Sequence, residues 1–96
     1  RIEEYRAKSM RYYHSAAQSG YAPALQSLSF AYSDGYVTAK DDYAAYKYLQ
    51  AYSLAVTRRT PSLDKLLIRF QSGLTPQQIA SAQREAIAIY SACCRR

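Results

Sequence analysis

Apolar residues recur along this chain at steps of three and four, the period of an α-helix that buries one face. Residues 2–17 follow this pattern, and it predicts a first helix. Gly20 follows, and because glycine adopts positive φ at little cost, we expect it to end that helix. The residues expected on the inner side of the first helix are Ile2, Tyr5, Ser9, Tyr12, Tyr13, Ala16 and Ala17.

Two further helices are predicted between residues 23 and 55. One runs from Pro23 to about Gly35 and turns Leu25, Leu28 and Tyr32 to one face, with Ala24 and Ser29 as small neighbours. The next begins after Asp41 or Asp42, because a short carboxylate can accept hydrogen bonds from the first free amides of a helix. Its expected buried residues are Ala45, Tyr48, Leu49, Tyr52 and Ala55.

The stretch "TRRTP" interrupts the pattern, and Pro61 then opens a short fourth helix. Its expected apolar residues are Leu63, Leu66, Leu67 and Phe70.

The last helix carries a clear start signal in "LTPQQIASAQREA". Thr75 suits the N-cap, Pro76 the first helical position and Gln78 the third, which makes a capping box. Leu74 and Ile79 are spaced as a hydrophobic staple. The apolar face is predicted to continue through Ala82, Ala86, Ile89 and Cys93.

An internal repeat joins these helices. "PALQSLSFAY" and "PSLDKLLIRF" align with Leu28 opposite Leu66 and Tyr32 opposite Phe70, at a shift of about 38 residues. The chain begins at Arg1 without an initiator Met, so we expect a processed or trimmed piece.

The stretch "AAQSGYAPALQSLSFAYSDGYVTAKDDYAAYKYL" resembles a Sel-one-like repeat, a relative of the tetratricopeptide repeat. The resemblance implies an all-α fold in which antiparallel helix pairs stack as a short α-solenoid. Within one domain, residues 1–19 are then the second helix of a preceding unit, 20–56 one full repeat and 57–96 capping helices. The positions that depart from the family pattern are Ser29, Val37 and Leu67. Adjacent helices are expected slightly further apart there.

Composition and charge limit the classes of function that this chain can have. The chain has 96 residues, 49% of them hydrophobic, which makes one small domain. Its net charge of +6 comes from 13 basic residues spread along the chain rather than gathered in a stripe, so a nucleic-acid partner is disfavoured and an acidic protein partner fits. The basic residues that an anion binder would use are Arg58, Arg59, Arg95 and Arg96.

Residue types that carry chemistry are scarce. His14 is the one histidine and is expected to be a polar surface residue, and no Cys/His set has the spacing of metal ligands. Cys93 and Cys94 are adjacent and are expected to be packing residues or free thiols. The sequence therefore predicts no enzyme, no metal, no cofactor and no small-molecule substrate.

The chain contains no apolar run of about 18 residues, so no membrane-spanning segment is expected. With any leader removed, a periplasmic or secreted location is favoured slightly over a cytoplasmic one.

Phe30 breaks the helical pattern. It lies about 200° around the helix from Leu28, on the side of Gln26 and Ser33, away from the predicted core. By resemblance, Gln26, Phe30, Ser33 and Asp34 line the concave groove that binds peptides or proteins. The turn tyrosines Tyr21 and Tyr36 lie at either end of the same helix and are candidates too. The tyrosines at core spacing are Tyr12, Tyr32, Tyr48 and Tyr52. A further helix or array covering Phe30 is the alternative.

The favoured function is a protein–protein interaction module, an adaptor or scaffold. An alternative is an inhibitor or immunity protein that occludes a toxin or an enzyme. A less favoured one is a basic surface for nucleic acid or anionic lipid. The resemblance implies signalling, envelope-assembly or secretion roles, in bacteria or eukaryotes.

Overall fold

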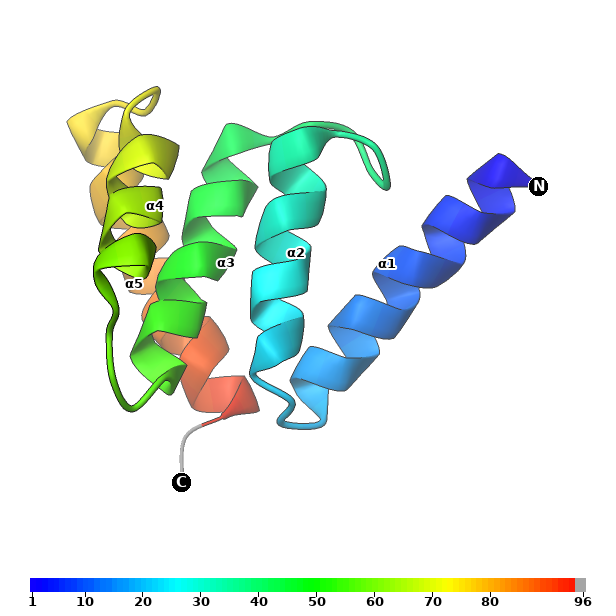
Figure 1. Ribbon diagram of the computed structural model, residues 1–96, viewed down its shortest axis with the longest axis horizontal. Coiled ribbons are helices and arrows are strands. Elements are labelled where there is room, and N and C mark those ends of the chain that lie inside the picture. The colour runs from blue at the N-terminus through cyan, green and yellow to red at the C-terminus, as the bar shows by residue number, and fades with distance from the viewer. Residues whose placement is uncertain (95–96) are drawn as a thin grey trace.

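The computed structural model describes residues 1–94, and these form an all-α structure, as predicted. The chain runs through five helices in succession (Figure 1), and this count applies to the described residues. They are α1 (Ile2–Gln18), α2 (Pro23–Asp34), α3 (Asp42–Ala55), α4 (Pro61–Gln71) and α5 (Pro76–Cys93).

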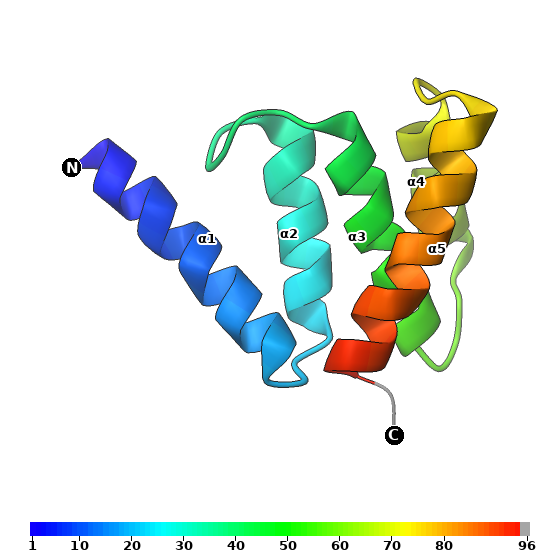
Figure 2. The same cartoon turned by 180° about the vertical axis from the view of Figure 1, so that it is seen from behind.

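Helix α3 lies at the centre of the arrangement. It runs antiparallel to α2 on one side and packs against α4 and α5 on the other (Figures 1 and 2). Helix α1 contacts α2 and the end of α5 near its own C-terminus, and it leans away from α2 toward its N-terminus (Figure 2). One end of α1 is therefore packed and the other is open.

Local signals set the helix boundaries. Gly20 and Gly35 follow α1 and α2 with positive φ angles of 97° and 75°, the left-handed region that glycine enters without steric cost. Asp41, the first of the two predicted candidates, caps α3 by accepting a hydrogen bond from the Ala44 amide over 3.1 Å. Thr60 caps α4 in the same way.

The predicted capping box of α5 is confirmed. The Thr75 hydroxyl accepts a hydrogen bond from the Gln78 amide (3.1 Å), and the Gln78 side-chain oxygen accepts one from the Thr75 amide (2.9 Å). Leu74 and Ile79, the expected staple pair, both pack against the same apolar cluster. This helix start is thus stabilised by both its polar and its apolar contacts.

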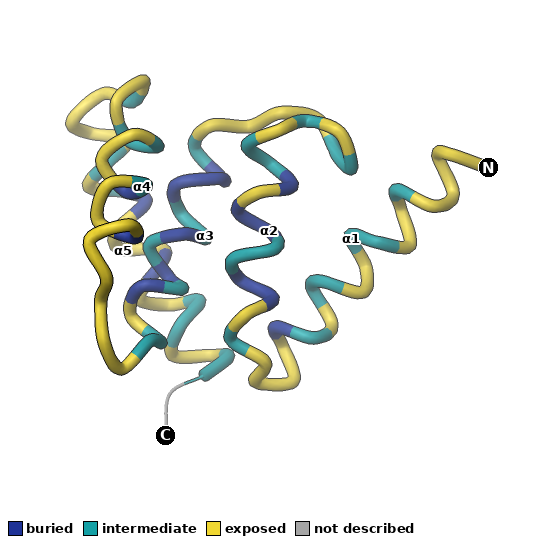
Figure 3. Tube along the Cα trace, in the orientation of Figure 1, coloured by how far each residue is buried: buried dark blue, intermediate teal, exposed yellow. Residues whose placement is uncertain are grey.

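Two apolar clusters make up the core. The first joins α1, α2, α3 and α5, and its buried members are Ala17, Ala24, Leu25, Leu28, Ala51 and Ala86. The second joins α3, α4 and α5 around Tyr46, Leu49, Leu63, Leu67 and Ala82. Buried positions are concentrated on α2 and α3, whereas most of α1 is exposed (Figure 3).

The prediction that one face of α1 is buried is wrong over much of the helix. Tyr12 is 68% exposed, and Ile2 and Tyr5 are exposed as well. The reason is that α1 diverges from α2, so α2 does not cover the side of α1 on which Ile2, Tyr5 and Tyr12 lie. Ala17, next to the turn, is the buried residue of this helix.

Tyr46 is a buried residue that the helical period did not reveal. It is 1% exposed, and its hydroxyl accepts a hydrogen bond from the side chain of Gln83 in α5 over 3.1 Å. Tyr48 and Tyr52, which were expected inside, are half-buried instead. Since α3 packs against other helices on more than one side, its single-face prediction was too narrow.

A candidate binding surface between α2 and α4

Phe30 of α2 and Phe70 of α4 contact each other. Their rings lie edge to face, with centroids 6.3 Å apart and planes at 80°. Phe30 remains 39% exposed and Phe70 is half-buried. This contact is the centre of what we call the α2–α4 surface, which consists of the Phe30–Phe70 pair and a hollow at each side of it.

The first hollow, of about 150 Å³, lies between the N-terminal end of α2 and the start of α4. Gln26 forms its α2 wall, and Leu66 lies on its α4 wall. Tyr52 and Val56 contribute from the end of α3, and Arg58 from the loop that follows. The lining therefore combines apolar side chains with the polar groups of Gln26, Thr60 and Ser62 and the cation of Arg58.

The second hollow, of about 230 Å³, lies at the opposite end of the same helices and is more polar. It is lined by Ser33 of α2 and by Arg69 and Phe70 of α4. The Arg69 guanidinium lies 5.8 Å from the centroid of the Phe70 ring, within the range of a cation–π contact. Lys40 also lines it and pairs with Asp42 over 2.9 Å.

Three of the six residues named from the sequence are therefore gathered on this surface: Gln26, Phe30 and Ser33. Their spacing of four and three residues places them on one side of α2. Phe70 and Arg69 are the main residues that sequence reasoning did not assign to the site. The internal repeat set Phe70 opposite Tyr32, which favoured a core role, so no sequence signal paired it with Phe30.

The other three named residues lie elsewhere. Asp34 ends α2, where its carboxylate accepts a hydrogen bond from the Tyr36 amide over 2.9 Å. The ring of Tyr36 faces α1, with the Arg6 guanidinium 4.9 Å from its centroid. Tyr21 is exposed in the turn between α1 and α2 and lines neither hollow. The loop tyrosines Tyr21 and Tyr36 therefore do not belong to the α2–α4 surface that Gln26, Phe30 and Ser33 help to form.

The basic pair Arg58–Arg59 divides between two places. Arg59 forms an ion pair with Asp64 over 2.8 Å, whereas Arg58 lines the first hollow. Arg95 and Arg96, the other pair considered for anion binding, lie outside the described residues.

A tyrosine stack lies behind this surface. The rings of Tyr32 and Tyr48 are parallel within 4°, with centroids 5.8 Å apart. Burial is the largest cause that raises the pKa of both phenols, and the Asp41 carboxylate adds to the rise at Tyr32. Both hydroxyls are therefore neutral at physiological pH, and the two rings serve packing.

His14 and the two cysteines differ from expectation. His14 is half-buried rather than a surface residue, and its ring lies edge-on to Tyr48 at 6.0 Å between centroids. Cys93 and Cys94 are joined to each other by a disulfide instead of being free thiols. Within residues 1–94, no group of His, Cys, Asp and Glu side chains is arranged to hold a metal ion, and no helix has the length and hydropathy needed to cross a bilayer.

Comparisons of the chain with protein families, with characterised proteins and with solved structures found no match. The α2–α4 surface is therefore interpreted from its own geometry.

Proposed function

We propose that this protein is a non-enzymatic interaction module that holds a segment of a partner protein on the α2–α4 surface. The observation that carries the proposal is the partial exposure of Phe30, an aromatic residue on the outer side of α2. Exposed aromatic residues with polar neighbours are typical of the few positions that dominate protein interfaces.

The surroundings of Phe30 support this role. Phe70 holds the Phe30 ring from one side, so the aromatic surface is already ordered before a partner arrives. A rigid anchor loses little conformational entropy on binding, which favours affinity. The hollows on either side can take up neighbouring side chains of a bound segment, with volumes of about 150 and 230 Å³.

The charges of the surface favour an acidic partner segment. Arg58 lies at one hollow and Arg69 at the other, and neither forms an ion pair among the described residues. A partner segment with an apolar residue between two acidic ones would place the apolar residue on Phe30 and the acidic residues near Arg58 and Arg69. Nucleic acid is a less favourable partner, because the charge of Arg59 is already paired with Asp64.

The proposal also includes the Sel-one-like repeat assignment. Its support is the order of the helices, in which α2 and α4 begin at the aligned prolines Pro23 and Pro61 and α3 and α5 follow them. In such an arrangement α2 and α4 are equivalent first helices, so a surface formed by both is a repeat-built surface.

Site-specific photo-crosslinking in native cell extract tests the function. A benzophenone side chain is placed at Ser62, an exposed residue at the first hollow, and in a matched variant at Ala80, an exposed residue of α5. We expect a cross-linked protein from Ser62 that is absent from Ala80 and that is lost when Phe30→Ala is added. Identical products from both positions, or a Ser62 product that survives Phe30→Ala, would contradict the proposal.

A further inference from the structure

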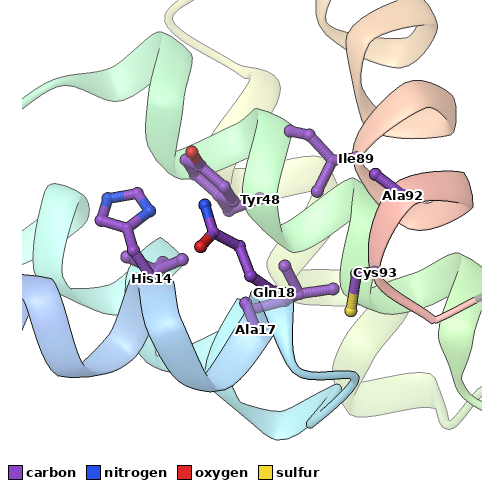
Figure 4. A pocket seen from close by; sticks show the side chains of 9 residues that line it. His14, Ala17, Gln18, Tyr48, Ile89, Ala92 and Cys93 are labelled. Carbon is purple, nitrogen blue, oxygen red and sulfur yellow. The ribbon is translucent and has the colours of Figure 1, made fainter.

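A third hollow, of about 220 Å³, lies where the C-terminal ends of α1 and α5 approach α3 (Figure 4). Its residues are not those of the α2–α4 surface. Leu25 and Leu28, both fully buried, contribute from α2, and Ile89 contributes from α5. The interior of this hollow is accordingly apolar.

Small side chains keep the hollow open. Ala17 of α1 and Ala92 of α5 approach it from the two sides, and neither reaches far enough to fill the space (Figure 4). The hollow is open to solvent on the side of the exposed residues Gln18 and Ala92, and its inner wall belongs to the first apolar cluster. An apolar ligand entering it would gain contacts that the free protein lacks.

One wall of the hollow is aromatic. The Tyr48 ring stacks on Tyr32 at 5.8 Å, meets His14 edge-on at 6.0 Å and has the Lys47 ammonium 5.3 Å from its centroid. Because Tyr48 is fixed by these neighbours, it presents an ordered ring surface. Aromatic pairs prefer edge-to-face or offset contacts, and such a wall favours another ring as its occupant.

Polar groups of this hollow come from His14, Gln18 and Tyr48. The side chains of His14 and Gln18 extend from α1 toward the Tyr48 ring, opposite Ile89 and the other α5 residues (Figure 4). No Lys, Arg, Asp or Glu is among the described residues that line the hollow. Burying an ionised group against the largely apolar lining would be costly, whereas one hydroxyl or N–H group can be hydrogen-bonded.

We propose that this hollow binds a small uncharged aromatic molecule that carries one hydroxyl or N–H group. The volume fits this class, since a cavity of about 150 Å³ lined by apolar side chains accepts benzene, and about 220 Å³ leaves room for a substituent. The ligand is bound and not transformed, because none of the lining groups forms a catalytic pair. This site is independent of partner binding at the α2–α4 surface.

Titration with p-cresol, followed by amide chemical shifts of the full chain, tests this site. We expect saturable shifts confined to the C-terminal ends of α1 and α5, the N-terminal half of α2 and the middle of α3. The dissociation constant should be on the order of 1 mM or tighter for a ligand of this size. Ala92→Leu should weaken binding by about tenfold or more, because the larger side chain occupies the hollow. Ala80→Leu, an exposed change on the same helix, should bind as wild type does.

The unfolding temperature of each variant without ligand shows that it is folded, and its rise with p-cresol gives a second measure of binding. The proposal is overturned if the shifts do not saturate, if they map to Phe30 and Phe70, or if Ala92→Leu binds p-cresol as tightly as wild type. Loss of p-cresol binding together with intact cross-linking at Ser62 would support the independence of the two sites.

Discussion

The hydroxyl of Ser29 in α2 donates a hydrogen bond to the carbonyl oxygen of Ala45 in α3 over 2.7 Å, and both residues are almost fully buried. The bond crosses the interface between the two helices that form the predicted full repeat. A polar group in this core is therefore satisfied by the neighbouring helix, and it ties α2 to α3 at one register.

Replacing Ser29 should show how much this hydrogen bond contributes to the free energy of unfolding. Ser29→Ala removes the bond without adding volume and should lower the free energy of unfolding by about 0.5–1.5 kcal/mol. Ser29→Val should cost more, about 1–3 kcal/mol in total, because the site has no space for extra methyl groups. Urea denaturation of both variants measures this order. Ser91→Ala, an exposed change on α5, is the control, and an effect there as large as at Ser29 would contradict the assignment.

The capping box of α5 allows a second test of stability. Thr75→Ala removes the acceptor for the Gln78 amide and should cost about 0.5–2 kcal/mol, whereas Thr75→Ser keeps the oxygen and should cost much less. Amide hydrogen exchange should accelerate first in residues 76–80. Unchanged protection of that segment in Thr75→Ala would show that the box does not hold the helix start.

The helix boundaries could be predicted because their signals are local. Pro61, Pro76 and Gly20 restrict or free the backbone at their own positions, and Thr75 needs only the next turn of its own helix. None of these depends on which other helix is nearby. This is why the all-α class and the start of α5 followed from the sequence.

Burial was harder to predict, because periodicity shows which face of a helix is apolar but not what covers it. Tyr12 has core spacing and is exposed where α1 diverges, whereas Tyr46 lies off the predicted face and is buried against α5. The same limit applies to the candidate site. The outward angle of Phe30 could be read from α2 alone, but its contact with Phe70 depends on how α4 packs.

The tyrosine stack predicts a loss of stability at alkaline pH. Burial is the main cause that raises the pKa of Tyr32 and Tyr48 above the 10.0 of a free phenol, and Tyr32 and Glu85 add to the rise at Tyr48. A raised pKa means that the fold favours the neutral phenol. The contribution of the two neutral phenols to the free energy of unfolding is complete below about pH 10. It is lost as the pH rises through their pKa values in the folded protein.

Urea denaturation between about pH 8 and pH 11.5 measures this loss. The free energy of unfolding should fall more steeply above about pH 10 in wild type than in Tyr48→Phe, which lacks one of the two phenols of the stack. Equal falls in both proteins would show that the Tyr48 hydroxyl does not contribute.

Arg58 lines the first hollow whereas Arg59 is paired with Asp64, so the two residues should affect partner binding differently. Arg58→Glu should slow association with an acidic partner at low salt by about tenfold, and the effect should fade at about 0.5 M salt. Arg59→Glu, which changes the net charge by the same amount, should change the rate less, because the Arg59 guanidinium is already paired with Asp64. Stopped-flow association rates across a salt series give the comparison. A larger effect at Arg59, or one that persists in high salt, would mean that Arg58 does not steer the partner.

The affinity of Phe30→Ala for the partner captured at Ser62 tests the central claim most directly. Isothermal titration should show a loss of about 2 kcal/mol, or roughly 30-fold, that persists at high salt. The matched control is Ile68→Ala, which removes an exposed apolar side chain of α4 that lies outside both hollows and should leave the affinity unchanged. Full affinity of a folded Phe30→Ala, or an equal loss in Ile68→Ala, would contradict binding at the α2–α4 surface.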